Sequence, residues 1–305
     1  MSYRVLNSIS VKNLSGKEFV KDKSSLLVVL VDKSAKKNKL LIHMDKVTKG
    51  SLFKSINSFM KSKGKSLNLQ SPDGVSSKEV LLMKTPEKSN TYLWLDLFKS
   101  ISKIANSLGK QDISVMFACK CPDGKDESWL TEVCCRQIEA SAYIFGSSKN
   151  KTVVKPSLKR ASIIASSVTA SALRKLKNSA KVGFAVGEAM NAAKHLGDMP
   201  ANLCTPRIIE RKVKALKKPF PKLKISTFNE KDLAKLKMGS FLSVGKGSDE
   251  PSRMMTIEHK GGKAGEKPIV LVGKGITFDT GGISLKPSPA MDEMKWDMCG
   301  AASVF

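Results

Sequence analysis

PIVLVGKGITFDTGGISLKPSPAMDEMKWDMCGAASVF, residues 268–305, is the most informative stretch of this 305-residue chain. It opens with the aliphatic run Ile269–Val272, which is short and bounded by proline and glycine, and this pattern predicts a buried strand. Glycines follow directly after the run, and Asp279 and Asp297 lie beyond them. We therefore expect a strand that leads into a polar, glycine-rich loop.

The acidic and basic side chains of this stretch suit a divalent cation. Two carboxylates near the ends of strands can converge on a hard or borderline cation through oxygen. A lysine can join them only as the free amine, because an ammonium has no lone pair. A second lysine that stays charged nearby can stabilise negative charge on a substrate oxygen. Residue types alone leave open a plain strand–loop turn with its lysines in solvent.

The charge of this stretch differs from that of the rest of the chain. The formal net charge is +26, from 53 Lys and Arg against 27 Asp and Glu. Residues 264–305 hold four lysines and five acids, so the basic excess disappears there. Elsewhere the excess is spread along the chain, and only seven of the 53 basic residues are arginines, the usual partners of guanine. A diffuse lysine surface favours solubility, and it also allows non-specific contact with nucleic acid.

Residues 272–304, VGKGITFDTGGISLKPSPAMDEMKWDMCGAASV, closely resemble the central signature of the leucyl aminopeptidase (cytosol aminopeptidase) family. Two segments upstream resemble the same family in the same order. They are AKHLGDMPANLCTP at 193–206 and FLSVGKGSDEPSRMMTIEHKGG at 241–262. The resemblance covers about residues 180–305, whereas the first 150 residues match only in their general α/β pattern.

The resemblance implies a role for five residues of this chain. Lys274, Asp279 and Asp297 would be metal ligands, with Asp279 bridging two divalent ions, Mn²⁺ or Zn²⁺. Lys286 would be the catalytic lysine that holds the scissile carbonyl oxygen, and Met294 would line the pocket for the substrate's first side chain. All five would contribute to substrate binding. The implied reaction is removal of N-terminal, leucine-like residues from peptides by a water that two metals activate.

The sequence departs from the family pattern in two ways. Cys299 stands where the family usually has a glycine. The family also has a later Asn-Thr-Asp-Ala-Glu-Gly-Arg segment that completes the metal shells, and this sequence does not contain it. We therefore expect the chain alone to be inactive or poorly folded. The family's hexamer is expected only at full length, and two alternatives stay open: a basic DNA-binding protein, or a non-catalytic subunit that docks into full-length partners.

Three segments are expected along the chain, within an α/β fold. They are an N-terminal mixed-sheet domain of macro-like type (1–150), a linker with the start of a long helix (151–180), and the incomplete α/β/α, zinc-peptidase-like catalytic domain (181–305). Strands are predicted at 25–31, 40–43, 80–84, 113–118, 223–228, 240–244, 254–259 and 268–272. Helices are predicted at 52–61, 93–108, 129–144, 171–196 and 206–216, with a short one opened by Asn229.

The remaining composition excludes several classes of protein. The longest strongly apolar run, Leu26–Val31, is far shorter than the roughly 20 residues that span a bilayer. The N-terminus has no apolar signal region, so the expected compartment is the cytoplasm, without a membrane partner. The six cysteines form no CxxC pair, which excludes the usual zinc-finger spacings. A site made of Cys119, Cys121, Cys134 and Cys135 is the alternative to ordinary buried thiols.

Overall fold

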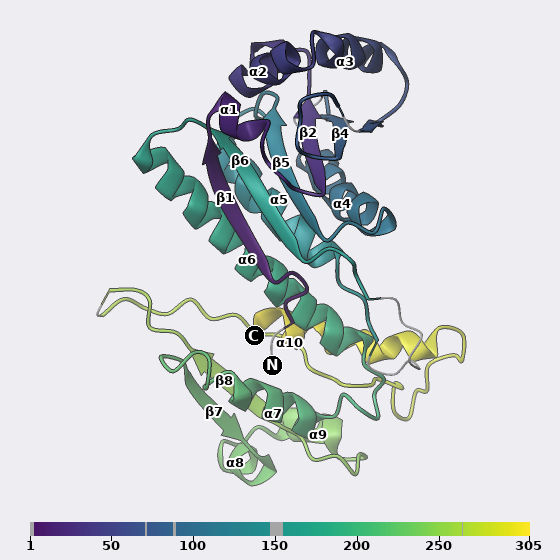
Figure 1. Ribbon diagram of the computed structural model, residues 1–305. Coiled ribbons are helices and arrows are strands. Elements are labelled where there is room, and N and C mark those ends of the chain that lie inside the picture. The colour runs from purple at the N-terminus through teal and green to yellow at the C-terminus, as the bar shows by residue number, and fades with distance from the viewer. Residues whose placement is uncertain (1–2, 71, 88–89, 147–154, 264) are drawn as a thin grey trace. The chain divides into compact units, whose positions relative to one another are not determined.

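The computed structural model describes residues 3–70, 72–87, 90–146, 155–263 and 265–305. They form two compact units that divide within one long helix. We call the unit that ends at Asn191 the N-terminal unit, and the unit built mainly from Ala192–Phe305 the C-terminal unit (Figure 1). Both units mix helices and strands, so the predicted α/β class is confirmed. No helix in the described ranges has the length and hydropathy that a bilayer span requires.

The N-terminal unit is built on a six-stranded sheet with the order β1-β6-β5-β2-β4-β3. The neighbouring strands are parallel, except that β3 runs antiparallel to β4. The sheet is therefore mixed, as predicted. Its strands are β1 (Ser8–Leu14), β2 (Leu26–Val31), β3 (Ser66–Gln70), β4 (Glu79–Lys84), β5 (Asp112–Ala118) and β6 (Arg160–Ser166).

Helices cover both faces of this sheet. The side chains of β2 point alternately to the two faces, and all six are completely buried. Leu26, Val28 and Leu30 join a core with α4, α5 and the first part of α6, whereas Leu27, Val29 and Val31 join a core with α1, α2 and α3. These helices are α1 (Gly16–Phe19), α2 (Lys39–Val47), α3 (Ser51–Lys61), α4 (Thr91–Ser107), α5 (Glu127–Ser141) and α6 (Ala170–Asp198).

The prediction of a strand at Leu40–His43 is wrong, because these residues lie in α2. The Oδ1 atom of Asn38 accepts hydrogen bonds from the backbone N–H groups of Leu40 and Leu41 and so caps the helix. Leu40, Leu41 and Met44 then pack their side chains on one helical face. A short 3-10 turn, η1 (Ala35–Lys37), precedes the cap.

The N-terminal unit continues beyond the boundary expected at residue 150. Strand β6 pairs with both β1 and β5, and Leu176 and Ala180 of α6 belong to one of the two cores. The proline-closed segment 146–156 was the basis of that boundary, and its residues 147–154 lie outside the described part of the chain. The unit extends further because β6 lies between β1 and β5 in the sheet, so the sheet is not complete without residues 160–166.

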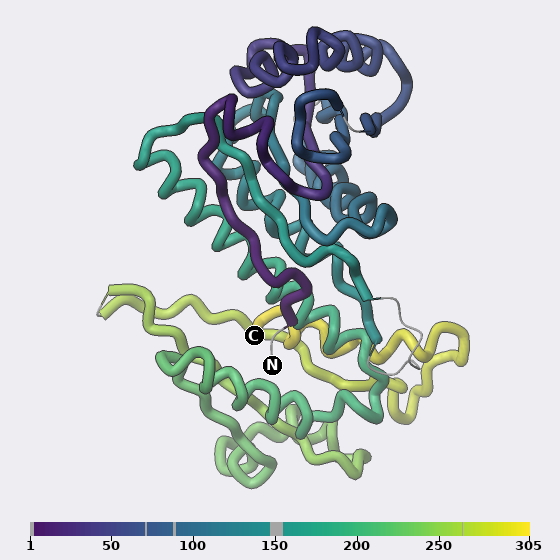
Figure 2. The backbone as a smooth tube through the Cα atoms, in the orientation of Figure 1, coloured from purple at the N-terminus to yellow at the C-terminus, as the bar shows by residue number. Residues whose placement is uncertain are grey.

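The C-terminal unit holds a two-stranded antiparallel sheet and several helices. Its core includes Leu196, Ile209, Val213 and Met298, all of which are buried. Figure 2 shows the long irregular path that the chain takes between β8 and η2. The elements are α7 (Pro206–Ala215), β7 (Lys224–Phe228), α8 (Glu230–Lys235), α9 (Gly239–Gly245), β8 (Met254–Glu258), the 3-10 helix η2 (Met291–Trp296) and α10 (Cys299–Val304).

Two strands predicted for this unit do not form. Ser240–Val244 lies in α9, where the N–H of Leu242 donates to the carbonyl of Met238 in the helical manner. Pro268–Val272 forms no strand, and the side chains of Ile269 and Val272 are 93% and 91% exposed. A strand needs a neighbour to complete its hydrogen bonds, and in the described ranges β7 and β8 pair only with each other.

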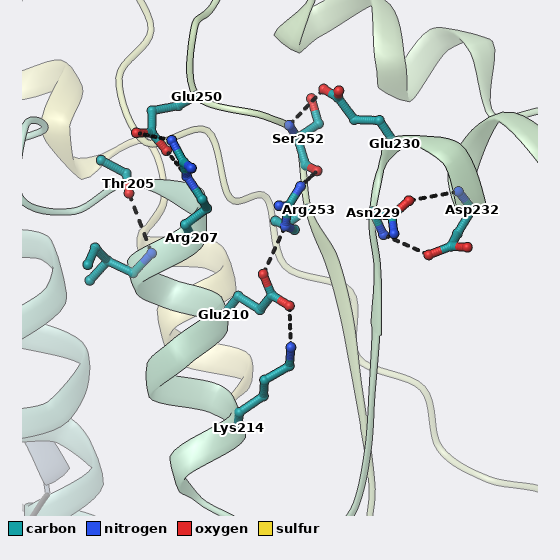
Figure 3. A network of polar contacts seen from close by, with 11 residues as sticks. Thr205, Arg207, Glu210, Lys214, Asn229, Glu230, Asp232, Glu250, Ser252 and Arg253 are labelled. Carbon is teal, nitrogen blue, oxygen red and sulfur yellow. Dashed lines mark hydrogen bonds and ion pairs between the residues drawn. The ribbon is translucent and has the colours of Figure 1, made fainter.

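A polar network connects α7 to the strand pair (Figure 3). Glu210 of α7 accepts from Arg253, just before β8, at 2.8 Å, and from Lys214 one helical turn later at 2.6 Å. Arg207 of α7 forms two hydrogen bonds of 3.0 Å with the carboxylate of Glu250. Glu210 and Arg253 are largely buried, so this pair fixes the position of α7 against the sheet.

Candidate metal centre

The predicted site residues lie along a segment that packs against the start of α10. The backbone N–H of Ala301 donates to the carbonyl of Lys274 at 2.7 Å. A Cβ atom on Gly273 would lie only 2.4 Å from the carbonyl oxygen of Gly300. The backbones can approach this closely because Gly273 has no side chain, and a Cβ atom on Gly300 would also be tight, 3.0 Å from the backbone N of Lys274. This contact brings Lys274 close to the end of η2, where Asp297 follows.

Lys274 and Asp297 form the first of two lysine–aspartate pairs. The Nζ atom of Lys274 lies 3.0 Å from the Oδ2 atom of Asp297. That oxygen is buried, and among the described residues its partner is the Lys274 ammonium, in an ion pair without hydrogen-bond geometry. A buried carboxylate oxygen needs a positively charged partner. The ammonium is that partner here, at a place that a bound cation could take.

Lys286 and Asp279 form the second pair. The Nζ atom of Lys286 lies 2.7 Å from Oδ2 of Asp279 and also donates to the carbonyl oxygen of Asp279 at 2.9 Å. The backbone N–H of Gly281 donates to Oδ1 of Asp279 at 2.9 Å. The Lys286 ammonium lowers the pKa of Asp279, and the Gly281 hydrogen bond lowers it further. The carboxylate is therefore held in its ionised form.

A glycine turn gives the second pair its geometry. Gly281 and Gly282 have φ angles of 96° and 75°, in the region that L side chains rarely adopt. A Cβ atom on Gly281 would lie 2.3 Å from the carbonyl oxygen of Ser284. The chain reverses here so that the N–H of Lys286 donates to the carbonyl of Thr280. The role of the Gly281 N–H was missed from the sequence, although the Asp-Thr-Gly-Gly pattern at 279–282 was its signal.

The two pairs are linked electrostatically. The charge of Lys274 makes a small further contribution to the lowered pKa of Asp279. Met294 is half-buried in η2, and its carbonyl accepts from the N–H of Asp297 at 3.2 Å. No hydrogen bond or ion pair given for the described residues joins the Met294 side chain to the lysines or aspartates. Its contact with a substrate stays a prediction.

The donor set fits a divalent cation in part. No group of three His, Cys, Asp or Glu side chains in the described ranges is arranged to hold a metal ion. Asp279 and Asp297 supply carboxylate oxygens, and Lys274, which is ion-paired with Asp297, can supply a nitrogen once deprotonated. The buried Oδ2 of Asp297, held by an ion pair and by no hydrogen bond among the described residues, supports this fit. The chemistry is that of an oxygen-rich site with one side open.

Cys299, the departure from the family pattern, fits its surroundings. A Cβ atom on Gly197 of α6 would lie 2.8 Å from the Sγ atom of Cys299, so the thiol occupies the space that Gly197 leaves. Burial raises the pKa of this thiol. The close contact between Gly273 and Gly300 is kept next to it, so a thiol at this position is compatible with the backbone packing around Asp297.

The family model for the catalytic domain of the cytosol aminopeptidase family matches residues 191–305. This range contains both lysine–aspartate pairs and the glycine turn. Residues 191–305 resemble the cytosol aminopeptidase family. The match begins at the division between the two units and takes in almost the whole C-terminal unit.

Curated relatives agree with this match. A probable cytosol aminopeptidase of Aromatoleum aromaticum is 42% identical over 216 residues, which is 70% of this chain and 42% of the relative. One from Alkalilimnicola ehrlichii is 58% identical over 123 residues, 40% of this chain and 25% of the relative. One from Azoarcus sp. is 38% identical over 267 residues, which is 86% of this chain and 53% of the relative. The chain spans about half the length, or less, of these relatives.

Solved structures share the fold. A tomato leucine aminopeptidase variant superposes with a TM-score of 0.70 at 22% identity and covers 97% of this chain and 57% of its own. The bottromycin maturation enzyme BotP, solved in complex with Mn, superposes with a TM-score of 0.65 at 21% identity. The match covers 92% of this chain and 54% of the BotP chain. Because nearly all of this chain is covered, the N-terminal unit shares the architecture of these proteins as well.

Proposed function

We propose that this chain supplies the front part of a metal-dependent aminopeptidase site that removes N-terminal, leucine-like residues from peptides. The observation that carries the proposal is the presence of two lysine–aspartate ion pairs, Lys274 with the buried Oδ2 of Asp297 and Lys286 with Asp279, within the range that matches the family. Lys274, Asp279 and Asp297 would hold two divalent ions, Mn²⁺ or Zn²⁺, and Asp279 would bridge them. The manganese complex of the related fold BotP supports the choice of metal.

Each residue has a separate task in this proposal. Bound metals would supply a water of lowered pKa and a docking point for the free amine of the peptide. Asp279, kept ionised by its neighbours, would offer carboxylate oxygen to the metals. Lys286 would stabilise the charge that develops on the scissile carbonyl oxygen. Met294 offers an adaptable apolar surface to the first side chain of the substrate.

The names of the relatives support the setting of the proposal. The curated relatives are described as probable cytosol aminopeptidases, which favours peptide substrates and a cytoplasmic location. A homo-hexamer is proposed for the full-length form only. The domain division also stays a proposal: an accessory α/β domain begins at residue 1, a linker with the start of the long helix follows, and residues 181–305 are the N-terminal part of the catalytic domain.

Metal binding tests the ligand assignment directly. We expect purified chain to bind Mn²⁺ in a titration followed by electron paramagnetic resonance. Asp297→Asn and Asp279→Asn should each weaken binding by about tenfold or more, since even the loss of an outer-shell partner usually costs 10–100-fold. Asp292→Asn, an exposed acid five residues from Asp297, is the matched control and should bind as the wild type does. Equal binding by all four proteins would refute the assignment.

Hydrolysis of a leucine chromogenic amide tests the reaction. Lys274 is exposed and the site is open on one side, so we expect the isolated chain to show little or no activity with added Mn²⁺ or Zn²⁺. Measurable hydrolysis that Lys286→Ala removes would establish the peptidase reaction and overturn the expectation that this chain is inactive alone. Activity that survives Lys286→Ala would contradict the role given to that lysine.

A further inference from the structure

The N-terminal unit contains a cavity of about 170 Å³ that the metal centre does not use. Its lining comes from three places: the start of α2, the end of β5 with the first turn of α5, and the end of β6. All three lie at or just beyond the carboxyl ends of parallel strands. The cavity is therefore at the edge of the sheet where open α/β folds bind their ligands.

The topology of the sheet explains why a hollow forms at this edge. After β2 the chain passes through α2 and α3 to β3 and β4, whereas after β5 it passes through α5 to β6 (Figure 1). These connections leave in opposite directions along the sheet and cover opposite faces. Strands β2 and β5 are neighbours, so a crevice opens between their ends. This arrangement is a topological switch point.

The cavity wall is mainly apolar, with one carboxylate. Phe117, Leu130, Ile164 and Val168 contribute hydrocarbon and aromatic surface. Glu127, the first residue of α5, is half-buried and has no hydrogen bond or ion pair among the contacts described. Burial raises the pKa of Glu127, and the neighbouring charge of Asp126 raises it further. A carboxylate in this position is short of a cationic partner.

The other polar groups of the cavity indicate which charge a ligand would carry. Cys119 and Cys121 line it as free thiols. Burial raises the pKa of both thiols, with further contributions from Asp32 and Glu127 at Cys119 and from Glu127 and Asp126 at Cys121. The thiols therefore stay neutral at pH 7, and Glu127 is the one acidic or basic side chain in the lining. A carboxylate without a cation beside it in the lining disfavours an anionic ligand, and in the described ranges no three ligating side chains gather to hold a metal.

We propose that this cavity binds a small organic amine, with its ammonium group at Glu127 and its apolar body against Phe117, Leu130 and Val168. The volume suits this class, because a cavity of about 150 Å³ accommodates benzene. The ammonium supplies the charge-assisted hydrogen bond that Glu127 does not have. This site lies within one unit and is independent of the proposed peptidase function.

Benzylamine is the probe that tests the proposal. Calorimetric titration of the full chain at pH 7, with EDTA present to remove metal, should show saturable binding of benzylamine. Benzyl alcohol has the same shape without the charge and should bind at least about tenfold more weakly, as expected for loss of one charged hydrogen bond. Benzoate should not bind.

Two variants and a control locate the site. Glu127→Gln should lower benzylamine affinity by about tenfold or more, and Val168→Phe, which fills the cavity, should abolish binding. Glu132→Gln on the same helix lies outside the cavity lining and should leave affinity unchanged. Circular dichroism melting checks that each variant is folded. Absence of benzylamine binding to the wild type would overturn the proposal. So would a benzylamine affinity of Glu127→Gln and Val168→Phe equal to that of the wild type.

Discussion

At the scale of single residues, buried polar groups define what this chain can tolerate. Glu139 of α5 is completely buried, and its two carboxylate oxygens accept from the backbone N–H groups of Val5 and Leu6 at 2.6 and 3.0 Å. The side-chain amide of Asn191 donates to it as well, at 3.2 Å. One carboxylate thus connects the N-terminal segment, α5 and α6 within the N-terminal unit.

Replacement of Glu139 should destabilise the N-terminal unit. Glu139→Gln keeps the shape but turns an N–H₂ group toward one of the two backbone donors, which should cost about 1–3 kcal/mol in the free energy of unfolding. Chemical denaturation followed by circular dichroism measures this cost. A change below the error of the method would show that the backbone donors find other partners.

The pH dependence of stability should also change in Glu139→Gln. Burial raises the pKa of Glu139 above its ordinary value of 4.5, despite the hydrogen bonds that lower it. The folded state therefore holds this proton more tightly, so the contribution is complete below pH 4.5 and is lost as the pH rises through the folded pKa. Denaturation at several pH values should show this loss in the wild type. The Gln variant should lack it.

The two adjacent glycines after Asp279 provide a matched pair of substitutions. Gly281→Ala would place a Cβ 2.3 Å from the Ser284 carbonyl, whereas a Cβ at Gly282 meets nothing within 4 Å. Both residues have positive φ, so both substitutions carry the same kind of backbone strain, about 1–2 kcal/mol. We expect Gly281→Ala to lose Mn²⁺ affinity by about tenfold or more, because it displaces the N–H that orients Asp279. Gly282→Ala should lose clearly less, and equal losses would contradict this account of the turn.

At the scale of elements, the position of α7 depends on its contact with Arg253, the residue directly before β8. Glu210→Gln removes the charge between Arg253 and Lys214 and should lower the free energy of unfolding by about 1–2 kcal/mol, since the pair with Arg253 is mostly buried. Glu250→Gln breaks the more exposed pair with Arg207 and should have a much smaller effect. Thermal denaturation of the two variants makes the comparison, and equal shifts would assign no special role to Glu210.

The sequence predicts elements well where their ends carry a chemical signal. Asn229 and Asp232 form a capping box at α8, as their spacing predicts, and β2 is recognisable as a continuous aliphatic run. The strand prediction at Leu40–His43 is wrong because the Asn38 cap starts a helix there, although the residues are aliphatic. The strand prediction at Pro268–Val272 is wrong for a different reason: a strand depends on a partner strand, which a local pattern does not report.

The candidate site follows the same division. Lys274, Asp279, Lys286 and Asp297 are identifiable from residue type and from family resemblance, and the structure joins them in two ion pairs. Which lysine pairs with which aspartate depends on the Gly281 turn and on the Gly273–Gly300 contact, and both are properties of the folded backbone. Glu127 and the cavity were not recognised, because their lining comes from segments far apart in the sequence.

At the scale of the whole molecule, the exposed aliphatic run at Ile269–Val272 should govern behaviour in solution. Four neighbouring large apolar side chains in solvent form a surface that favours association. Ile269→Lys with Val272→Lys should reduce self-association in dynamic light scattering. Leu236→Lys, at an isolated exposed leucine, is the control and should change it little. Unchanged self-association in the double variant would show that Ile269–Val272 is not the surface through which the chain associates.

The charge of the whole molecule gives a separate test of the nucleic-acid alternative. If the +26 charge serves phosphate contacts, the affinity for duplex DNA should fall steeply with salt, with a slope of about −0.9 per phosphate contacted. Filter binding between 50 and 200 mM salt measures the slope. A flat dependence, or no binding at low salt, would leave the lysines as a solvated surface.

The complete burial of strand β2 restricts the substitutions that the chain can tolerate. Because helices cover both faces of the sheet and all six side chains of Leu26–Val31 are buried, no position in the strand can take a polar residue without a penalty. In β7 and β8, where every position is at least partly open to solvent, polar residues can be accommodated. A saturation library should therefore recover almost exclusively aliphatic residues at six consecutive codons, and variation should concentrate in the small strand pair.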